Sequence, residues 1–211
     1  MILRLSGGRR LQSPLGDKAR PTTARVRLAV MNILAPRMSG CRWLDLCCGS
    51  GVMACEALQR GASQLVAVEQ DRRIAQVART NLASVAATHP ECAWQVHCRD
   101  VLAWLKSNNP AGLSAAQGGD LAKGSDLAQG FDLIYLDPPY ASGLYAPVAK
   151  ALAEHHWLAP GGLLLWECAS ASPPAVPQGW TLEQQRRYGT TTLMLLSRRA
   201  GCPGDTGSRR P

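Results

Sequence analysis

The residues of this chain best suited to chemistry form the run Asp137-Pro138-Pro139-Tyr140, directly after an apolar stretch. Proline fixes the backbone torsion φ and has no N–H donor, so the Asp137 carboxylate and the Pro138 carbonyl can both accept from one amino group. Tyr140 offers a flat face for a stacked base, which is worth roughly 1–3 kcal/mol. Such positioning suits transfer of a methyl group to a conjugated amine. We therefore predict these four residues as catalytic; the structural alternative is a plain proline turn.

A glycine-rich turn lies upstream, in the run Leu44-Asp-Leu-Cys-Cys-Gly-Ser-Gly51. Glycine lets the backbone come close to a ligand, because it has no Cβ. A lone Gly-x-Gly occurs in many turns. Ala54 also takes the third position of the dinucleotide pattern Gly-x-Gly-x-x-Gly, so the turn favours a pyrophosphate site only weakly.

Acidic residues mark the ends of three expected strands. Asp45 precedes the turn, Glu69 ends the next apolar stretch, and Asp100 follows the one after it. In an open parallel sheet the carboxyl ends of the strands line the crevice where ligands bind. Asp45 can hold an ammonium group there, Glu69 the hydroxyls of a ribose, and Asp100 an adenine amino group. Each residue alone is more often a helix cap or a solvated loop residue, but together they predict a ligand site.

These residues need a scaffold, and the apolar pattern predicts alternating strands and helices. The expected strands are 43–47, 64–69, 94–98, 131–136 and 163–168, followed by a closing antiparallel pair, 180–185 and 191–197. Helices are expected at 52–60, 72–86, 101–106 and 146–155. This alternation predicts an α/β fold, with a mostly parallel seven-stranded sheet covered by helices on both faces.

The expected domain organisation has two units. Residues 1–36 predict a basic N-terminal hairpin and a helix, which Thr22 or Thr23 caps and Pro36 ends. The main domain is expected over 37–199. Within it, 107–130 is rich in Gly, Ala, Ser, Asn and Asp and predicts a flexible insertion. The Gly- and Arg-rich tail, 200–211, predicts disorder.

Composition limits the class of partner. The 211 residues are 46% apolar, which suits one globular domain, and the net charge of +8 favours a polyanionic partner such as nucleic acid. Five arginines near the N-terminus are the predicted phosphate-binding residues: Arg9, Arg10, Arg20, Arg25 and Arg27. Two alternatives remain open, namely that some of them pair with acidic neighbours, or that the segment around Arg20 covers the bound ligand.

The cysteines and the apolar runs indicate the compartment. None of the eight cysteines stands in a C-x-x-C pair or has zinc-ligand spacing, so we expect reduced thiols and no metal site. The basic N-terminus lacks a following apolar run, and no segment reaches the roughly 18 apolar residues of a membrane span. We therefore expect a cytoplasmic protein without a membrane partner.

The motifs and their order resemble a known family, the bacterial 16S rRNA (guanine-N2)-methyltransferases that act on guanine 966. These are Rossmann-like class I methyltransferases with an Asp-Pro-Pro-Tyr motif. The resemblance spans about residues 4–198 outside the insertion. Its motifs are Arg20-Pro-Thr-Thr-x-Arg-x-Arg27, Asn32, the glycine turn, Glu56-Ala-Leu-x-Arg-Gly-Ala62, Val68-Glu69, Asn81-Leu82 and Asp137-Pro-Pro-Tyr140. The chain departs from the family at Cys47-Cys48, where Phe-Ala is usual, at Leu28, where Glu is frequent, and in the length of the insertion.

The resemblance implies S-adenosylmethionine (AdoMet) as the methyl donor and N2 of a guanine as the acceptor. The implied cofactor-binding residues are Asp45, Cys47, Gly49, Ser50 and Gly51 at the methionine end, Glu69 at the ribose and Asp100 at the adenine. The implied substrate is 16S rRNA in a partly assembled small ribosomal subunit. We expect a monomer with no obligate protein partner.

Three other functions fit parts of the sequence. A DNA adenine-N6 methyltransferase uses the same amine chemistry, but such enzymes usually carry a separate target-recognition domain, for which the chain has no room. A non-catalytic RNA-binding assembly protein of the same fold would have no need of intact motifs. A small-molecule methyltransferase would need neither the basic charge nor Tyr140.

Overall fold

The computed structural model of the protein describes residues 3–14, 23–113, 127–139 and 142–199. Five of the features predicted above lie wholly or partly outside the described residues: Arg20, Thr22, Tyr140, the tail 200–211 and the middle of the insertion, 114–126.

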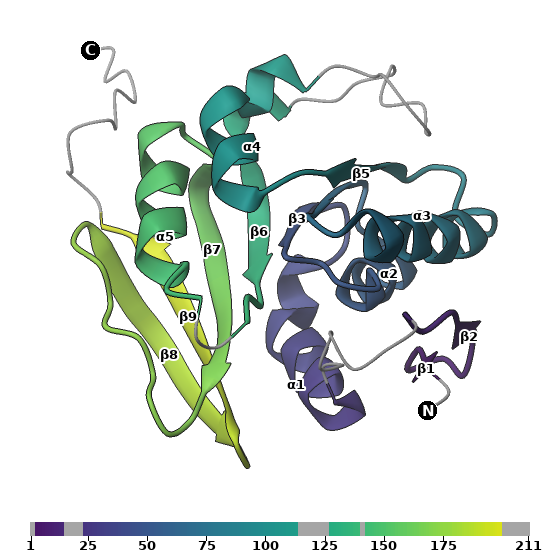
Figure 1. The fold of residues 1–211 in the computed structure, drawn as a ribbon, viewed down its shortest axis with the longest axis horizontal. Coiled ribbons are helices and arrows are strands. Elements are labelled where there is room, and N and C mark those ends of the chain that lie inside the picture. The colour runs from purple at the N-terminus through teal and green to yellow at the C-terminus, as the bar shows by residue number, and fades with distance from the viewer. Residues whose placement is uncertain (1–2, 15–22, 114–126, 140–141, 200–211) are drawn as a thin grey trace.

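Seven strands form one sheet in the order β5-β4-β3-β6-β7-β9-β8 (Figure 1). They are β3 (Arg42–Leu46), β4 (Gln64–Glu69), β5 (Ala93–Cys98), β6 (Phe131–Leu136), β7 (Leu158–Ala169), β8 (Trp180–Tyr188) and β9 (Thr191–Arg198). Strands β3 to β7 pair in parallel, and β9 lies antiparallel between β7 and β8. The predicted mostly parallel sheet with an antiparallel C-terminal strand is confirmed.

Helices cover both faces of the sheet (Figure 1). On one face lie α1 (Ala24–Leu34), α2 (Val52–Gln59) and α3 (Arg72–Ala86), and on the other lie α4 (Val101–Ser107) and α5 (Tyr145–Glu154). Successive strand residues alternate between the two cores, as the pleat requires. Trp43 and Tyr135 pack on the α1–α3 face, whereas Leu44 and Ile134 pack on the α4–α5 face.

Polar residues set where the helices begin. The Thr23 hydroxyl accepts from the Val26 N–H, so Thr23 caps α1. Asp71 caps α3 by accepting from the N–H groups of Arg73 and Ile74. These caps satisfy N–H groups that have no partner inside the helix. The α-helix α1 ends at Leu34, and a 3-10 turn over Ala35–Arg37 accommodates Pro36.

The N-terminal elements pack on the main domain. Strands β1 (Leu3–Arg4) and β2 (Arg10–Leu11) form the predicted antiparallel hairpin. Leu5 of the hairpin and Val30 of α1 belong to the same core as α2 and α3. The proposed boundary between residues 36 and 37 therefore crosses a shared core, and it stays a prediction.

The bounds predicted for the insertion, 107–130, include packed residues at both ends. Residues Pro110–Gly112 and Leu127–Gln129 form 3-10 turns, and α4 extends to Ser107. Leu113 and Leu127 are buried in the α4–α5 core. The low-complexity composition hid these two apolar anchors, which belong to the packed domain.

None of the helices in the described ranges is long and apolar enough to cross a membrane.

Candidate active site at the carboxyl edge of the sheet

The chain order reverses between β3 and β6, and the predicted site residues gather at the carboxyl ends of the strands around this point. Leu46 pairs with Val68 of β4 and with Leu136 of β6, so the next residues along, Glu69 and Asp137, flank the end of β3. Such a reversal is where ligands bind in open α/β sheets.

The Cys47 thiol lies within electrostatic reach of this group. Its pKa is raised to about 12, first by burial and then by the charges of four carboxylates, Glu69, Asp137, Asp45 and Asp100. Cys47 adopts a positive φ of 60°, which turns the chain sharply after β3. The four predicted acidic residues are thus brought together around one turn.

Asp45 is a buried carboxyl that is only partly satisfied. It is 1% exposed, and its Oδ2 accepts from the Ala54 N–H at 3.0 Å. Its Oδ1 has no hydrogen-bond partner in the described part of the chain. Burial raises the pKa of Asp45 to about 8, a rise that the Ala54 bond opposes. A buried acceptor of this kind suits a cationic donor from a ligand.

Glu69 ties the end of β4 to the glycine turn. Its Oε2 accepts from the Gly49 N–H at 3.0 Å, and its Oε1 accepts from the Asp71 N–H at 2.9 Å. An ionised carboxylate oxygen can accept a second hydrogen bond, so both oxygens keep capacity for hydroxyl donors. Glu69 therefore has a structural role that the sequence did not reveal, beside the predicted one.

The turn needs glycine at positions 49 and 51 for different physical reasons. Gly49 has φ 53°, and a Cβ built on it would meet nothing within 4 Å, so the turn faces open space there. Gly51 has φ 73°, and its Cβ would lie 3.2 Å from that of Ala78 on α3. Gly49 therefore leaves room for a ligand, whereas Gly51 allows close packing of the turn on α3.

Asn81 of α3 binds Ser50, the residue of the turn between the two glycines. Its Nδ2 donates to the Ser50 carbonyl at 2.9 Å and to the Gln12 carbonyl at 3.0 Å, and its Oδ1 accepts from the Gln12 N–H at 2.8 Å. Asn81 thus links the turn to the segment after the hairpin. The motif containing Asn81 was noted in the sequence, but no role was predicted for it; a buried amide among apolar helix residues was the available signal.

Asp100 is an exposed helix cap. Its Oδ1 accepts from the Ala103 N–H at 2.8 Å at the start of α4. This is the ordinary role that the sequence left open for it, and the second oxygen is still available. The contact of Asp100 with adenine stays a prediction.

The Asp-Pro-Pro segment follows β6. Asp137 is half-buried, Pro138 is buried and Pro139 is exposed. The Pro139 carbonyl accepts from the Ser142 N–H at 2.9 Å. The segment therefore carries Asp137 at the carboxyl edge, beside Cys47.

A buried acid beside Asp137 was not predicted. Glu167 of β7 is 4% exposed, and it follows Trp166, the partner of Leu136, so it lies next to Asp137 in the sheet. Its Oε2 accepts from the Tyr135 hydroxyl, and its carbonyl accepts from the Tyr145 hydroxyl at 2.7 Å. A glutamate inside the apolar run of β7 was the signal for this network.

The predicted phosphate-binding arginines separate into two groups. Arg10 and Arg25 are exposed, and Arg9 donates to the Ser84 carbonyl at 2.9 Å. Arg27 is 6% exposed; it donates to the Arg4 carbonyl at 2.6 Å and lies 3.6 Å from Glu56. This burial favours the alternative that Arg27 pairs with an acidic neighbour, and binding of RNA by Arg27 stays a prediction.

Glu56 explains why Arg27 is buried. It is fully buried, pairs with Arg60 as well, and accepts from both the N–H and the hydroxyl of Ser6. It thus joins α2, α1 and the N-terminal hairpin. The acidic Glu56 inside the otherwise apolar stretch 52–58 was the signal for this junction.

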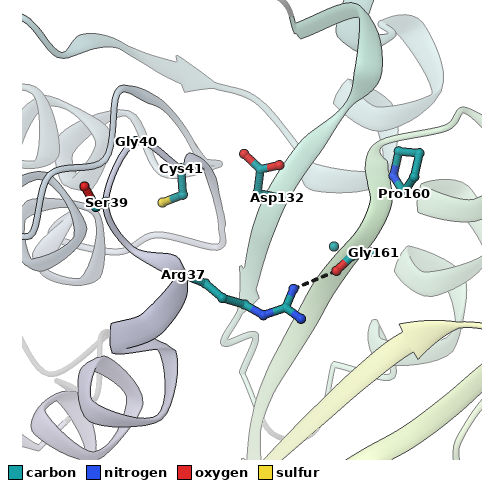
Figure 2. Close-up of a pocket in the computed structure, with 8 residues that line it drawn as sticks. Arg37, Ser39, Gly40, Cys41, Asp132, Pro160 and Gly161 are labelled. Carbon is teal, nitrogen blue, oxygen red and sulfur yellow. Dashed lines mark hydrogen bonds between the residues drawn. The ribbon is translucent and has the colours of Figure 1, made fainter.

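A cavity of about 280 Å³ lies at the other edge of the sheet (Figure 2). It is lined by residues at the amino ends of the strands, among them Cys41 and Asp132. Figure 2 shows the Arg37 side chain reaching across to the Gly161 carbonyl, at 2.7 Å. Ligands of open α/β sheets bind at the carboxyl ends, so this cavity is separate from the candidate site.

The strand order, the glycine turn and the acidic strand ends define a Rossmann-like methyltransferase of class I. The model of the family Conserved hypothetical protein 95 matches residues 4–197, and the chain belongs to this family.

Relatives and solved structures agree with this assignment. The chain is 29% identical over 194 residues to Ribosomal RNA small subunit methyltransferase D of Escherichia coli K12. The alignment covers 92% of this chain and 86% of the relative. It is 28% identical to the Haemophilus influenzae protein of the same name, covering 92% and 91%. The solved structure of yhhF from Escherichia coli superposes with a TM-score of 0.72, at 28% identity, covering 95% of this chain and 99% of that one.

Proposed function

We propose that the protein transfers a methyl group from AdoMet to the exocyclic N2 of a guanine in 16S rRNA, guanine 966. The observation that carries this proposal is the gathering of Asp45, Glu69 and Asp137 around one glycine turn at the switch point of the sheet. The names of the relatives, which are ribosomal RNA small subunit methyltransferases, support the substrate class.

The described residues fit AdoMet. The unpartnered Oδ1 of Asp45 matches its ammonium group, the open space at Gly49 leaves room for the methionine part, and the Glu69 carboxylate keeps lone pairs for the ribose hydroxyls. When bound, AdoMet supplies an electrophilic methyl group on a sulfonium centre.

The protein contributes position and electrostatics to the reaction. The Asp137 carboxylate and the Pro138 carbonyl accept the two hydrogens of the guanine amino group, and so direct its nitrogen lone pair toward the methyl group. The charge of the carboxylate stabilises the positive charge that develops on the nitrogen. Tyr140 is proposed to stack on the base.

Two alternatives use the same fold. A DNA adenine-N6 methyltransferase needs a surface that reads duplex sequence, and the small-subunit rRNA enzymes among the relatives do not favour it. A non-catalytic assembly protein would not need to keep a buried, half-satisfied carboxyl such as Asp45, whose burial is costly.

The state of the substrate follows from the chemistry of the amine. A paired guanine uses its amino group in the base pair, so the target base must be unpaired or flipped. We propose that a partly assembled small subunit presents this base in a fixed shape to a monomeric enzyme. Raising the salt concentration should slow the reaction, because phosphate contacts release counterions.

The test is to incubate the protein with labelled AdoMet and three substrates: naked 16S rRNA, small-subunit particles from cells that lack the gene, and duplex DNA. Digestion of the product should yield 2-methylguanine at one position, with the faster rate on particles. Label in 6-methyladenine of the DNA would establish the first alternative. Binding of particles without transfer of label would establish the second.

A further inference from the structure

A groove of about 540 Å³ runs between helix α1 and the edge strand β8. Its α1 side presents Arg25, Leu28 and Asn32, and its β8 side presents Gln184, Arg186 and Tyr188. The groove thus combines two guanidinium groups, two amides and one aromatic ring with three aliphatic side chains of α1, Leu28, Ala29 and Ile33. None of its β8 residues was expected to take part in function.

The β8 side of the groove continues in the sheet toward the candidate active site. Residues paired across a sheet have their side chains on the same face. Arg186 pairs with Leu193 of β9, and Leu193 pairs with Glu167 of β7. Glu167 in turn lies next to Asp137, so Arg186 and Asp137 stand in one row, on the face that α1 covers.

The spacing along this row suits a short stretch of nucleic acid. Adjacent strands lie about 4.8 Å apart, so the three steps from β6 through β7 and β9 to β8 place Arg186 about 14 Å from Asp137. A few nucleotides of an extended single strand span this separation, and each nucleotide carries one phosphate.

The charges in the groove are not neutralised by acidic side chains. Among the residues that the structure describes, Arg25 and Arg186 form no ion pair. When the amide oxygen of Gln184 faces Arg186, it accepts from Nε of that arginine at 3.1 Å and from a terminal guanidinium nitrogen at 2.9 Å. These bonds orient the guanidinium of Arg186 without cancelling its charge. Arginines held in this way suit phosphate oxygens, and Tyr188 suits a stacked base.

We propose that the groove between α1 and β8 binds the single-stranded rRNA that flanks the target guanine. The inference rests on the proposed function, because it assigns the flanking part of the same substrate. The two residues between Arg186 and Asp137 in this row, Leu193 and Glu167, are buried, so the row gives the separation of the two ends and not the path of the strand. The exposed Leu28 side chain suits contact with sugars and bases rather than with phosphates.

Strand β8 provides a matched pair of arginines for the test. Arg186 and Arg187 are adjacent and both exposed, but they lie on opposite faces of the sheet. Arg187 pairs with Thr192 and donates to the Gly189 carbonyl, away from the groove. Arg186→Ala, Arg187→Ala and Arg25→Ala are compared with the unmodified protein in binding to particles from cells that lack the gene, over a range of salt.

The expected result is a loss of affinity of about fivefold for Arg186→Ala and for Arg25→Ala, with little change for Arg187→Ala. Each groove variant should also reduce the slope of log K against log salt by about 0.7, the value of one contact to a single strand. AdoMet affinity should stay unchanged in all three variants, because none of the three arginines lies at the proposed cofactor site. Equal effects of Arg186→Ala and Arg187→Ala, or no effect of the two groove variants, would overturn the proposal.

Replacing Tyr188 by a photoreactive phenylalanine identifies the occupant directly. A crosslink to 16S rRNA beside the target guanine supports the groove as an RNA site, and crosslinks to ribosomal protein alone contradict it. If the protein with the photoreactive residue crosslinks to rRNA but the unmodified protein transfers no methyl group, the proposed reaction fails while the assignment of the groove stands.

Discussion

The Glu69 carboxylate accepts a hydrogen bond at 3.0 Å from the N–H of Gly49, twenty positions earlier in the chain. The end of β4 is thereby fixed to the turn after β3. A second bond, from the Asp71 N–H at 2.9 Å, joins the same carboxylate to the start of α3. One side chain therefore sets the geometry of three elements around the proposed cofactor site.

Replacing Glu69 by Ala should lower both stability and AdoMet affinity. Two backbone N–H groups lose their partner, at about 1–3 kcal/mol for each one that stays buried. At 2–4 °C per kcal/mol, the melting temperature should fall by roughly 4–24 °C. Calorimetry should show weaker AdoMet binding as well, by about tenfold or more. An unchanged melting temperature with weakened AdoMet binding would show that the contacts of Glu69 to the backbone do not hold the turn.

Arg27 should matter for stability and Arg25 for RNA. Arg27→Ala leaves the buried Glu56 without one of its two arginine partners, at a cost of about 3 kcal/mol. Arg25→Ala removes an exposed side chain from the same helix and is the matched control. Thermal melting should separate the two variants clearly. Equal melting temperatures would contradict the structural role of Arg27.

Asp45 should make AdoMet binding depend on pH. Its folded-state pKa of about 8 lies above the ordinary value near 4, so the folded protein without ligand holds a proton that the unfolded chain has lost. The contribution of Asp45 to stability is therefore full below pH 4 and is lost as the pH rises to about 8. Binding of an ammonium group requires the ionised form, so AdoMet affinity should rise over the same range.

Asp45→Asn tests this relationship. The variant cannot ionise, so its AdoMet affinity should be weak at every pH, and its stability should decline less than that of the unmodified protein between pH 4 and 8. Calorimetry and melting curves at several pH values measure both. A pH profile of affinity that persists in Asp45→Asn would assign the titration to another group.

The ends of the predicted insertion should be needed for folding. Deleting 107–130 removes the buried Leu113 and Leu127, each worth about 2–5 kcal/mol by comparison with other core leucines. Deleting only 114–126 keeps both anchors, and the composition of that segment predicts a much smaller fall in melting temperature. Similar falls for the two deletions would contradict the anchoring role.

Much of the fold could be predicted from the sequence, because most strands and helices carry a clear apolar period. The bounds of β4, α3 and β6 agree with the predictions to the residue. Strand β7 begins at Leu158, five residues before its prediction, because Pro160 and Gly161 interrupt the apolar pattern; Leu158 still pairs with Phe131, and the register shifts before Leu163. Tertiary pairing outweighs local propensity at such a place.

A candidate site residue could be predicted where a carboxylate stands beside a recognisable turn in the sequence, as for Asp45 and Asp137. It was not predictable where a residue acts through partners far along the chain. The contact between Arg27 and Glu56 joins positions 27 and 56 across two elements, and spacing alone made Arg27 look like part of a basic arm. The groove at β8 was also hidden, since it exists only when α1 packs beside the last strands.

The most direct test of the central claim compares the unmodified protein with Asp137→Ala on small-subunit particles from cells that lack the gene. The unmodified protein should place labelled methyl on N2 of one guanine. Asp137→Ala should lose about a hundredfold or more in rate, the typical loss when one stabilising group is removed, with AdoMet affinity within a few-fold. Asp137→Asn, which keeps an acceptor oxygen, should retain part of the rate. Transfer by Asp137→Ala at the unmodified rate, or a loss of AdoMet binding as large as the loss of rate, would contradict the account.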